Sequence, residues 1–235
     1  MVTASRGPIA VVTGASRGIG RAIARALAAR GDRVALWARD AAALDAVAAD
    51  IAAAGGTARA VVVDVTDAAA VARAADATRA AFAGDRVEIV VNNAGAVARA
   101  PTAALTDADW HRVIASNLDA TFYVTRAFLP DLQRGGGRII NIASIAGRQG
   151  TPLLAAYCAA KHGVVGFTRS LAEELRPARV CVNAICPGSV DTQMLREGLP
   201  DASPDMTPDD IARTAVFLAH DAPTALTASC IDVFG

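Results

Sequence analysis

The chain has 235 residues, with 23 basic and 23 acidic side chains and therefore no formal net charge. This balance provides no broad field to attract nucleic acid or an anionic membrane surface. Because 53% of the residues are hydrophobic and 20% are charged, an intrinsically disordered chain is excluded. No apolar run reaches the roughly 18 residues of a membrane-spanning helix.

Short β-branched runs alternate with Ala-rich helical stretches along the whole chain. Strands are predicted at Ile9–Thr13, Arg33–Trp37, Ala58–Val63, Val87–Val91, Arg138–Ile142, Val180–Ile185 and Cys230–Val233. Helices are predicted at about 18–30, 40–54, 67–83, 107–133, 156–176 and 207–220. This alternation predicts an α/β fold, in which helices cover both faces of a doubly wound, seven-stranded parallel sheet.

No linker, repeat or change of composition divides the chain, so residues 1–235 are interpreted as a single domain. The segment 193–206, rich in Gly and Pro, is its most loop-like part and is interpreted as a short substrate-side segment. Residues 1–13 lack the apolar stretch of a signal peptide. The four cysteines show neither disulfide nor metal spacing, which predicts a cytoplasmic protein without a metal site.

A glycine-rich turn, Thr13–Gly20, follows the first predicted strand and opens a helix. Its spacing is G-x-x-x-G-x-G, and glycines there let backbone amides approach a phosphate at the positive end of the helix. A strand-to-helix turn with no ligand is the alternative interpretation. The candidate cofactor residues in this turn are Gly14, Ser16, Arg17, Gly18, Ile19 and Gly20.

The end of the second strand carries the candidates for cofactor choice. Asp40 could accept a hydrogen bond from the ribose of NAD, as acidic groups near this strand end commonly do. Strand geometry instead favours Asp40 as the cap of the next helix and places Ala38 or Arg39 at the strand tip. Arg39 and Arg17 could then flank the 2′-phosphate of NADP with charge-assisted hydrogen bonds. Two solvated arginines are the alternative.

The strongest chemical signal is Tyr157 with Lys161. They lie four residues apart on a predicted helix and therefore share a face. Lys161 is the only lysine beside 22 arginines, which marks a position where arginine does not serve. A nearby ammonium is expected to lower the tyrosine pKa from about 10, so that the phenol can exchange a proton with substrate. Ser144 follows a strand on the rim where such sheets bind ligands.

Together these residues resemble the short-chain dehydrogenase/reductase family over essentially the whole chain. The motifs that carry the resemblance are Thr13–Gly20, Asn92–Gly95, Asn117, Ser144, Tyr157–Lys161 and Pro187-Gly188. The resemblance implies a Rossmann fold and an active-site tetrad of Asn117, Ser144, Tyr157 and Lys161. In it Tyr157 is the acid or base, Ser144 binds the carbonyl oxygen, Lys161 also holds the nicotinamide ribose, and Asn117 holds a water.

The resemblance also implies the remaining cofactor contacts and the activity. Asp64 and Val65 resemble the adenine contacts, and Arg39 with Arg17 resembles the pattern of NADP users, with NAD(H) the less favoured cofactor. Further contacts are implied for Asn92, Ala94, Gly95, Pro187, Gly188, Val190 and Thr192. The expected activity is reversible hydride transfer between NADP(H) and a carbonyl or secondary alcohol, by a homo-oligomer, most simply a tetramer.

Two alternatives to a reductase of free small carbonyl compounds stay open. One is reduction of 3-oxoacyl groups on an acyl-carrier protein, and the other is a cofactor-sensing protein without turnover. An acidic carrier would seek a basic surface. Glu173 and Glu174 follow Lys161 between Arg169 and Arg176, so the local charge is neutral and favours free substrates.

Overall fold

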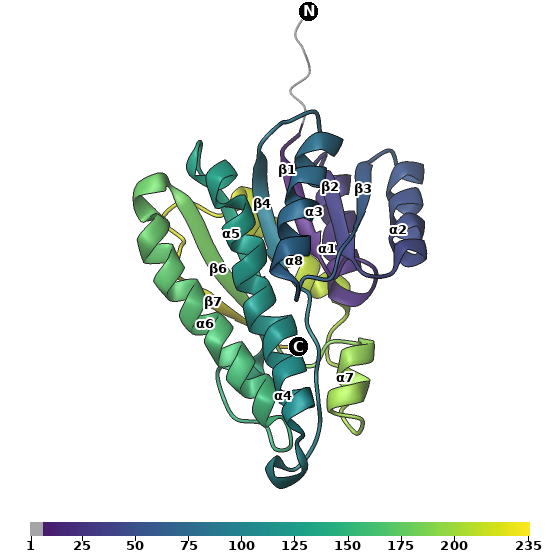
Figure 1. Cartoon of the computed structure of the whole chain (residues 1–235), viewed down its shortest axis with the longest axis vertical. Helices are drawn as coiled ribbons and strands as arrows, with labels where there is room; N and C mark the ends of the chain where they lie inside the picture. The colour runs from purple at the N-terminus through teal and green to yellow at the C-terminus, as the bar shows by residue number, and fades with distance from the viewer. Residues whose placement is uncertain (1–6) are drawn as a thin grey trace, which may run out of the picture.

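The computed structural model describes residues 7–235, so the expectation about residues 1–13 falls partly outside it. As predicted, seven parallel strands form one sheet; their order is β3-β2-β1-β4-β5-β6-β7 (Figure 1). The strands are β1 (Ile9–Thr13), β2 (Arg33–Ala38), β3 (Thr57–Val62), β4 (Val87–Asn92), β5 (Gly137–Ile142), β6 (Val180–Pro187) and β7 (Cys230–Val233). Strands β1 and β6 are buried along their full length, which explains their continuous apolar sequences.

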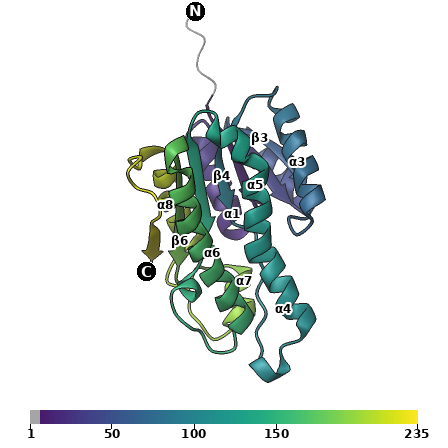
Figure 2. The same cartoon turned by 60° about the vertical axis from the view of Figure 1, so that its left-hand side comes forward.

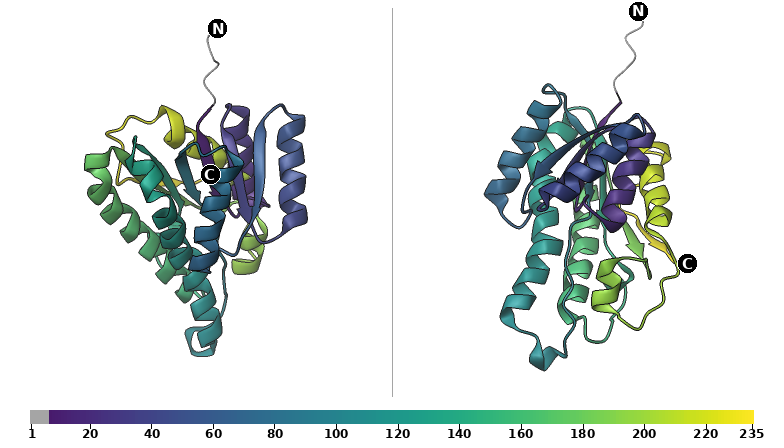
Figure 3. Two further views of the ribbon diagram at one scale, coloured as in Figure 1. Left: turned by 45° about the horizontal axis from the view of Figure 1, so that its top comes forward. Right: turned by 90° about the vertical axis from the view of Figure 1, so that its right-hand side faces the viewer.

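Helices cover both faces of this sheet (Figures 2 and 3). They are α1 (Gly18–Ala29), α2 (Ala41–Ala53), α3 (Ala68–Ala81), α4 (Asp107–Ile114), α5 (Ala120–Gln133), α6 (Ala155–Leu175), α7 (Gln193–Gly198) and α8 (Pro208–Val216). One buried cluster lies under α1, α2 and α8, and a second lies under α3, α5 and α6. The family fold predicted from the sequence, a doubly wound sheet with two apolar layers, is thereby confirmed.

Side-chain caps set several helix starts where the sequence indicates them. Thr106 accepts a hydrogen bond from the Asp109 amide at 3.0 Å, and Thr207 with Asp210 forms a full capping box. Asp40 caps α2 by accepting from the Ala43 amide at 3.0 Å. Asp40 is therefore used as a helix cap, one of the two roles that the sequence left open.

Two predicted helices are interrupted, and one predicted loop is partly helical. The stretch 107–133 contains a π-helical turn, Ala115–Asp119, between α4 and α5. The last predicted helix likewise ends in a π turn, Phe217–Asp221. Within the loop-like segment after Thr192, the helix α7 forms because the Thr192 hydroxyl accepts from the Leu195 amide at 3.2 Å.

The strand order reverses between β1 and β4, which pair with each other although the chain runs through β2 and β3 between them. Ligands of doubly wound sheets bind beyond the carboxyl ends of the strands at such a reversal. The helices α4 and α7 extend beyond this end of the sheet (Figures 1 and 2). Within residues 7–235, no helix combines the length and apolar character needed to cross a membrane.

Candidate active site

The glycine-rich turn lies at the carboxyl end of β1 and is shaped by conformations that favour glycine. Gly14 and Gly18 have φ values of 64° and 53°. A Cβ on Gly20 would lie 2.3 Å from the Gly14 carbonyl oxygen, so only glycine allows α1 to start this close to the turn. The turn thus presents the first amides of α1, with half-buried Ser16 and Ile19, where an anionic ligand would be stabilised.

Two side chains that the sequence analysis did not select hold this turn in place. The Thr13 hydroxyl accepts from the backbone amides of Asn93 and Ala94 at 2.9 and 3.0 Å. The Asn93 side chain donates to the Thr13 carbonyl at 2.9 Å. The pair of asparagines at the end of β4 could have signalled this role, because a buried amide side chain requires hydrogen-bond partners.

Tyr157 and Lys161 lie on the first turns of α6, with the Lys161 ammonium 5.6 Å from the centre of the Tyr157 ring. Lys161 is only 4% exposed. Its Nζ donates to the Ile142 carbonyl, at the end of β5, at 2.8 Å. This contact holds the Lys161 ammonium at the end of β5. The Tyr157 hydroxyl and the Lys161 ammonium lie on the same side of α6.

The pKa values of this pair differ from the sequence expectation. Burial raises the pKa of Tyr157 to about 12, which a contact with the Ser144 hydroxyl partly opposes. Burial lowers the pKa of Lys161 to about 8. The expected fall in the tyrosine pKa is therefore wrong for the chain alone, because loss of water around the phenol outweighs the opposing hydrogen bond with Ser144. At neutral pH the tyrosine is protonated and the lysine is mostly charged.

Ser144 faces Tyr157 from the turn that follows β5. Its hydroxyl accepts from the Ala146 amide at 3.1 Å and starts the short helix Ile145–Gly147. The same hydroxyl approaches the Tyr157 phenol closely enough to affect its pKa. Ser144 is thus a local cap whose hydroxyl also lies beside the Tyr157 phenol.

Asn117 lies in the π turn between α4 and α5 and is 1% exposed. Its Nδ2 donates to the carbonyls of Ala96 and Val113 at 2.7 and 2.8 Å. Its Oδ1 has no partner within residues 7–235, and it abuts Gly95, where an added Cβ would lie 2.4 Å away. π turns are frequent at functional sites. In this turn the side-chain nitrogen of Asn117 makes two hydrogen bonds, while its side-chain oxygen is left without one.

Two arginines and one hydrogen-bonded carboxylate follow the carboxyl ends of the neighbouring strands β1, β2 and β3. Arg39 is 80% exposed, and its nearest carboxylate is Asp64 at 4.0 Å. The Asp64 carboxylate accepts hydrogen bonds from the Thr66 amide and hydroxyl at 3.0 and 2.7 Å. The hydrogen bond from the amide lowers the pKa of Asp64. Arg17, exposed at the start of α1, contacts Gln193 rather than standing free beside Arg39. The place where the sequence predicts a 2′-phosphate contact is therefore exposed on the Arg39 side.

The chain after β6 returns over the glycine turn. Pro187 ends β6, the Gly188 amide donates to the Val233 carbonyl at 2.9 Å, and Val190 pairs with Met206. Thr192 lies over the turn, because a Cβ on Gly18 would be 3.5 Å from its Cγ2. The next helix then brings the Met194 sulfur to 3.8 Å from the Tyr157 hydroxyl, a contact that the sequence did not indicate.

Two of the expected cofactor residues point elsewhere. The Asn92 side chain is buried and donates to Thr125 at 3.0 Å and to Asn141 at 2.8 Å. It therefore ties β4 to β5 and α5 instead of forming a wall of the site. The Val65 side chain is also buried, in the core beneath α3. At Asn92 and Val65 only the backbone remains available to contact a ligand.

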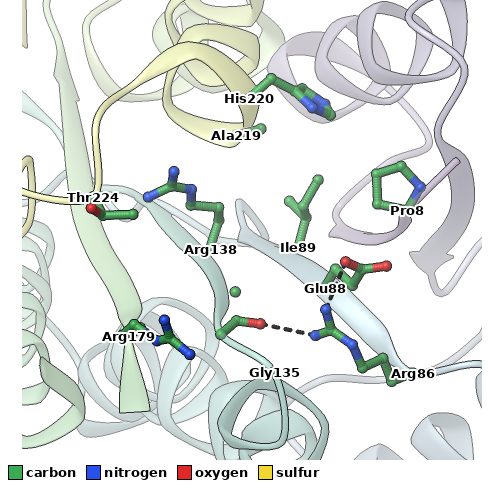
Figure 4. Close-up of a pocket in the computed structure, with 12 residues that line it drawn as sticks. Pro8, Arg86, Glu88, Ile89, Gly135, Arg138, Arg179, Ala219, His220 and Thr224 are labelled. Atoms are coloured by element: carbon green, nitrogen blue, oxygen red, sulfur yellow. Dashed lines mark hydrogen bonds and ion pairs between the residues drawn. The ribbon is translucent and has the colours of Figure 1, made fainter. Parts of the chain in front are cut away.

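A second hollow lies at the opposite end of the sheet, around the amino ends of β4, β5 and β6. It is a groove of about 470 Å³ lined by Arg86, Arg138, Arg179 and His220 (Figure 4). Arg86 contacts Glu88 at 2.8 Å, and the groove contains neither Tyr157 nor the glycine turn. In the described part of the chain, no three metal-ligating side chains cluster in this groove or elsewhere.

Comparison with known proteins agrees with this geometry. The family model described as short chain dehydrogenase matches residues 8–202. A 3-oxoacyl-[acyl-carrier-protein] reductase of Synechocystis is 41% identical, covering 100% of this chain and 98% of its own. A 2-dehydro-3-deoxy-L-rhamnonate dehydrogenase (NAD(+)) of Sphingomonas is 37% identical, covering 97% and 94%.

Among solved structures, an actinorhodin polyketide ketoreductase variant with NADPH superimposes with a TM-score of 0.91. It is 35% identical, and the match covers 97% of this chain and 96% of that chain. The curated relatives and the solved structure match along nearly the full length, and the family model matches residues 8–202. The chain therefore belongs to the short-chain dehydrogenase family of oxidoreductases.

Proposed function

We propose that the protein is an NADP(H)-dependent oxidoreductase that interconverts a carbonyl compound and a secondary alcohol. The observation that carries the proposal is the meeting of Ser144, Tyr157 and Lys161 at the carboxyl end of β5. A neutral phenol, a hydroxyl and a buried ammonium are the groups that carbonyl reduction needs around the oxygen. A cofactor-sensing protein without turnover has no use for this set.

The side chains divide the chemistry between them. The bound cofactor supplies a hydride to the carbonyl carbon during reduction and accepts one during oxidation. In reduction Tyr157 donates the proton from its Oη to the carbonyl oxygen, and Ser144 donates a hydrogen bond to the same oxygen. The Lys161 ammonium stabilises the phenolate that remains. We assign to the free Oδ1 of Asn117 the hydrogen bond to a water that returns the proton.

NADP(H) is the cofactor that the charges favour. Arg39 is exposed at the end of β2, and Asp40, the acid that could repel a phosphate, is engaged as the cap of α2. A charge-assisted hydrogen bond to phosphate contributes about 1.5–3 kcal/mol, which corresponds to at least about tenfold preference. NADPH in the polyketide ketoreductase structure supports this choice, although the rhamnonate enzyme is named for NAD(+).

We rank free small carbonyl compounds ahead of carrier-bound acyl groups as substrates. Arg176 on the outer end of α6 is paired with Glu173 at 2.6 Å, which leaves little positive charge there for an acidic carrier. The Synechocystis reductase keeps carrier-bound 3-oxoacyl groups as the second candidate. The side of the candidate site formed by α7 is apolar around Met194, because Gly198 of this helix packs against Val97 and Leu154.

The test is a substrate screen with NADPH and NADH. Simple ketones, 3-oxoesters and a 3-oxoacyl carrier-protein thioester are compared by kcat/KM. The proposal expects NADPH oxidation with a free ketone or oxoester. A large advantage for the thioester that disappears at high salt would reverse the substrate ranking. Cofactor binding without turnover on the whole panel would leave a sensing function instead.

We also propose that the enzyme is a homo-oligomer, most simply a tetramer. Phe122 on α5 is 41% exposed and its ring meets those of Tyr123 and Phe167 in tilted and edge-on contacts, so a partly exposed aromatic cluster spans α5 and α6. An apolar face of this kind is usually covered by a partner. Light scattering of the purified chain at micromolar concentration distinguishes an oligomer from a single copy.

A further inference from the structure

The groove at the amino end of the sheet contains four basic side chains, and two of them already have strong partners. The Arg86 guanidinium donates to the Gly136 carbonyl at 2.9 Å and pairs with Glu88 at 2.8 Å. His220 pairs with the buried Asp32 at 2.8 Å. These contacts hold Arg86 and His220 on opposite sides of the groove (Figure 4).

Arg138 lies between these two sides, and most of its hydrogen-bonding capacity is unused (Figure 4). Its Nη2 donates to the Ala222 carbonyl at 2.9 Å, whereas its Nη1 is buried without a partner. A guanidinium has five N–H donors and keeps its charge at any ordinary pH. In residues 7–235 no carboxylate lies within ion-pair distance of it, so the half-buried Arg138 carries an uncompensated charge.

Arg179 is the second uncompensated cation, and its backbone is strained. Its φ of 55° lies in the left-handed region, which side chains other than that of glycine disfavour. The side chain is exposed, lines the groove and forms neither an ion pair nor a hydrogen bond in the described part of the chain. Glycine would adopt this backbone with less strain, so the local fold does not account for an arginine here.

The two uncompensated cations come from neighbouring strand ends. Gly137 of β5 pairs with Val180 of β6. Arg138 follows the first of these residues and Arg179 precedes the second, so both line the same hollow. Two positive charges in one hollow repel each other and favour a ligand that carries two negative charges. Guanidinium groups also bind phosphate oxygens through paired N–H donors.

We propose that this groove is a binding site for a small phosphomonoester, whose phosphate is held by Arg138 and Arg179. A phosphate monoester has a second pKa of about 6 and therefore carries nearly two negative charges at neutral pH, which matches the two free cations. The groove volume of about 470 Å³ lies in the range of small-molecule sites, so it also accommodates the organic part of an ester. Pro8 and Ile89 provide apolar contacts for that part. The inference is independent of the proposed function, because Tyr157 lies at the other end of the sheet.

The first experiment titrates the protein with phenyl phosphate by calorimetry at about pH 7.5, where the ester is a dianion. NADP⁺ is present at a saturating concentration, so that the glycine turn and Arg39 are occupied. One saturable site per chain is expected. Phenyl sulfate has the same shape but one charge, and it should bind at least about tenfold more weakly. Tighter binding of succinate than of phenyl phosphate would assign the groove to dicarboxylates and overturn the proposed ligand.

The second experiment repeats the titration with Arg138→Gln, Arg179→Gly and the control Arg25→Gln. Each substitution removes one positive charge, and Arg25 is an exposed arginine on α1 outside the groove. Loss of a charge-assisted hydrogen bond should weaken phenyl phosphate binding at least about tenfold in both groove variants and leave the control unchanged. Arg179→Gly should keep or raise Tm, because glycine relieves the left-handed backbone. Weaker binding in this variant is then not the result of a damaged fold.

The variants also separate this site from the cofactor site. Wild-type affinity for phenyl phosphate in both groove variants would place the probe elsewhere and contradict the proposal. Absence of saturable binding to the wild-type chain contradicts it as well. Failure of the proposed function has a different sign, namely that NADP⁺ does not bind. The comparison of Arg138→Gln and Arg179→Gly with Arg25→Gln still tests the groove in that case.

Discussion

The two ends of the sheet treat charge in opposite ways. At the carboxyl end the buried Lys161 has no carboxylate within ion-pair distance in the described chain, and its ammonium bonds to a carbonyl. At the amino end, buried Asp32 pairs with His220 at 2.8 Å, and buried Asp131 pairs with Arg79 at 2.7 Å. Both ends belong to the same seven strands, yet these two buried carboxylates at the amino end are paired, whereas the buried ammonium at the carboxyl end is not.

This difference separates two uses of a polar residue in one fold. The paired carboxylates Asp32 and Asp131 at the amino end hold helix ends and turns together. Removing one partner of such a buried pair leaves the other buried without compensation. At the carboxyl end, the polar groups of Tyr157, Lys161 and Asn117 are incompletely paired, which lowers the stability of the fold. Substitutions at the carboxyl end should therefore change rates, and those at the amino end should change stability.

The largest expected effect is at Tyr157. Tyr157→Phe keeps the ring but removes the proton that is transferred, so kcat should fall by roughly 10²–10⁴-fold. The free energy of unfolding should change little, since the hydroxyl contacts only Ser144 and a weakly accepting sulfur. Steady-state kinetics and urea unfolding of the same preparation give both values. Turnover close to wild type would remove Tyr157 from its assigned role.

The pH dependence of reduction sharpens the role of Lys161. Its pKa of about 8 means that the ammonium is lost as the pH rises through that value. Reduction should be constant at lower pH and then fall about tenfold per pH unit, since the protonated form stabilises the phenolate. Tyr157, with a pKa of about 12, stays protonated over this range.

Lys161→Arg tests which group causes this fall. A guanidinium stays charged throughout the range, so the descent near pH 8 should disappear. The rate at neutral pH should also be much lower, because the planar group does not fit the space of the ammonium. A descent that persists at the same pH in this variant would assign it to another residue.

Asp131 tests the amino end. Its side chain is 1% exposed and also accepts from the Arg79 Nε at 2.8 Å, so Asp131→Ala leaves a partly buried cation with only an exposed carboxylate, Asp76, as its partner. The loss in unfolding free energy should be about 3 kcal/mol, at the low end for broken buried pairs because Arg79 keeps some contact with water. The kcat per folded molecule should stay unchanged.

Asp76→Ala is the matched control for that loss. Asp76 contacts the same Arg79 at 3.0 Å but is 82% exposed, so its removal should cost less than about 0.5 kcal/mol. Equal losses in the two variants would show that burial does not set the value of these pairs. The contrast between the two sheet ends would then lose its physical basis.

The smallest expected effect concerns cofactor choice at the carboxyl end. Arg39→Ala should lower kcat/KM for NADPH about tenfold and leave that for NADH nearly constant. Arg73→Ala, at an exposed position on α3, is the control. Unchanged preference in Arg39→Ala would show that the 2′-phosphate is held elsewhere.

The strands were predictable because buried parallel strands have continuous apolar sequences. The predicted Val87–Val91 and Arg33–Trp37 each extend by one residue in the structure, to Asn92 and Ala38. Tyr157 and Lys161 were predictable because helical spacing places them on one face, and the single lysine drew attention to them. The caps of α4 and α8 follow from local hydrogen bonding, which short sequence patterns record.

Features that depend on tertiary surroundings were not predictable in this way. The direction of the Tyr157 pKa depends on how much water surrounds it, which the spacing to Lys161 does not contain. The π turn at Asn117 inserts a residue into a helix without a local signal. The contact of Met194 with Tyr157 joins segments 37 residues apart and required the path of the chain after β6.

The single lysine also gives the molecule one internal mark for a protease. An endopeptidase that cuts only after lysine finds one susceptible bond, between Lys161 and His162, near the start of α6. A bond inside an intact helix is not cut, so the rate at which the two fragments form measures how often that helix opens. A compound that binds the folded protein slows this cleavage. The affinities of different compounds can therefore be ranked without turnover and before a substrate is identified.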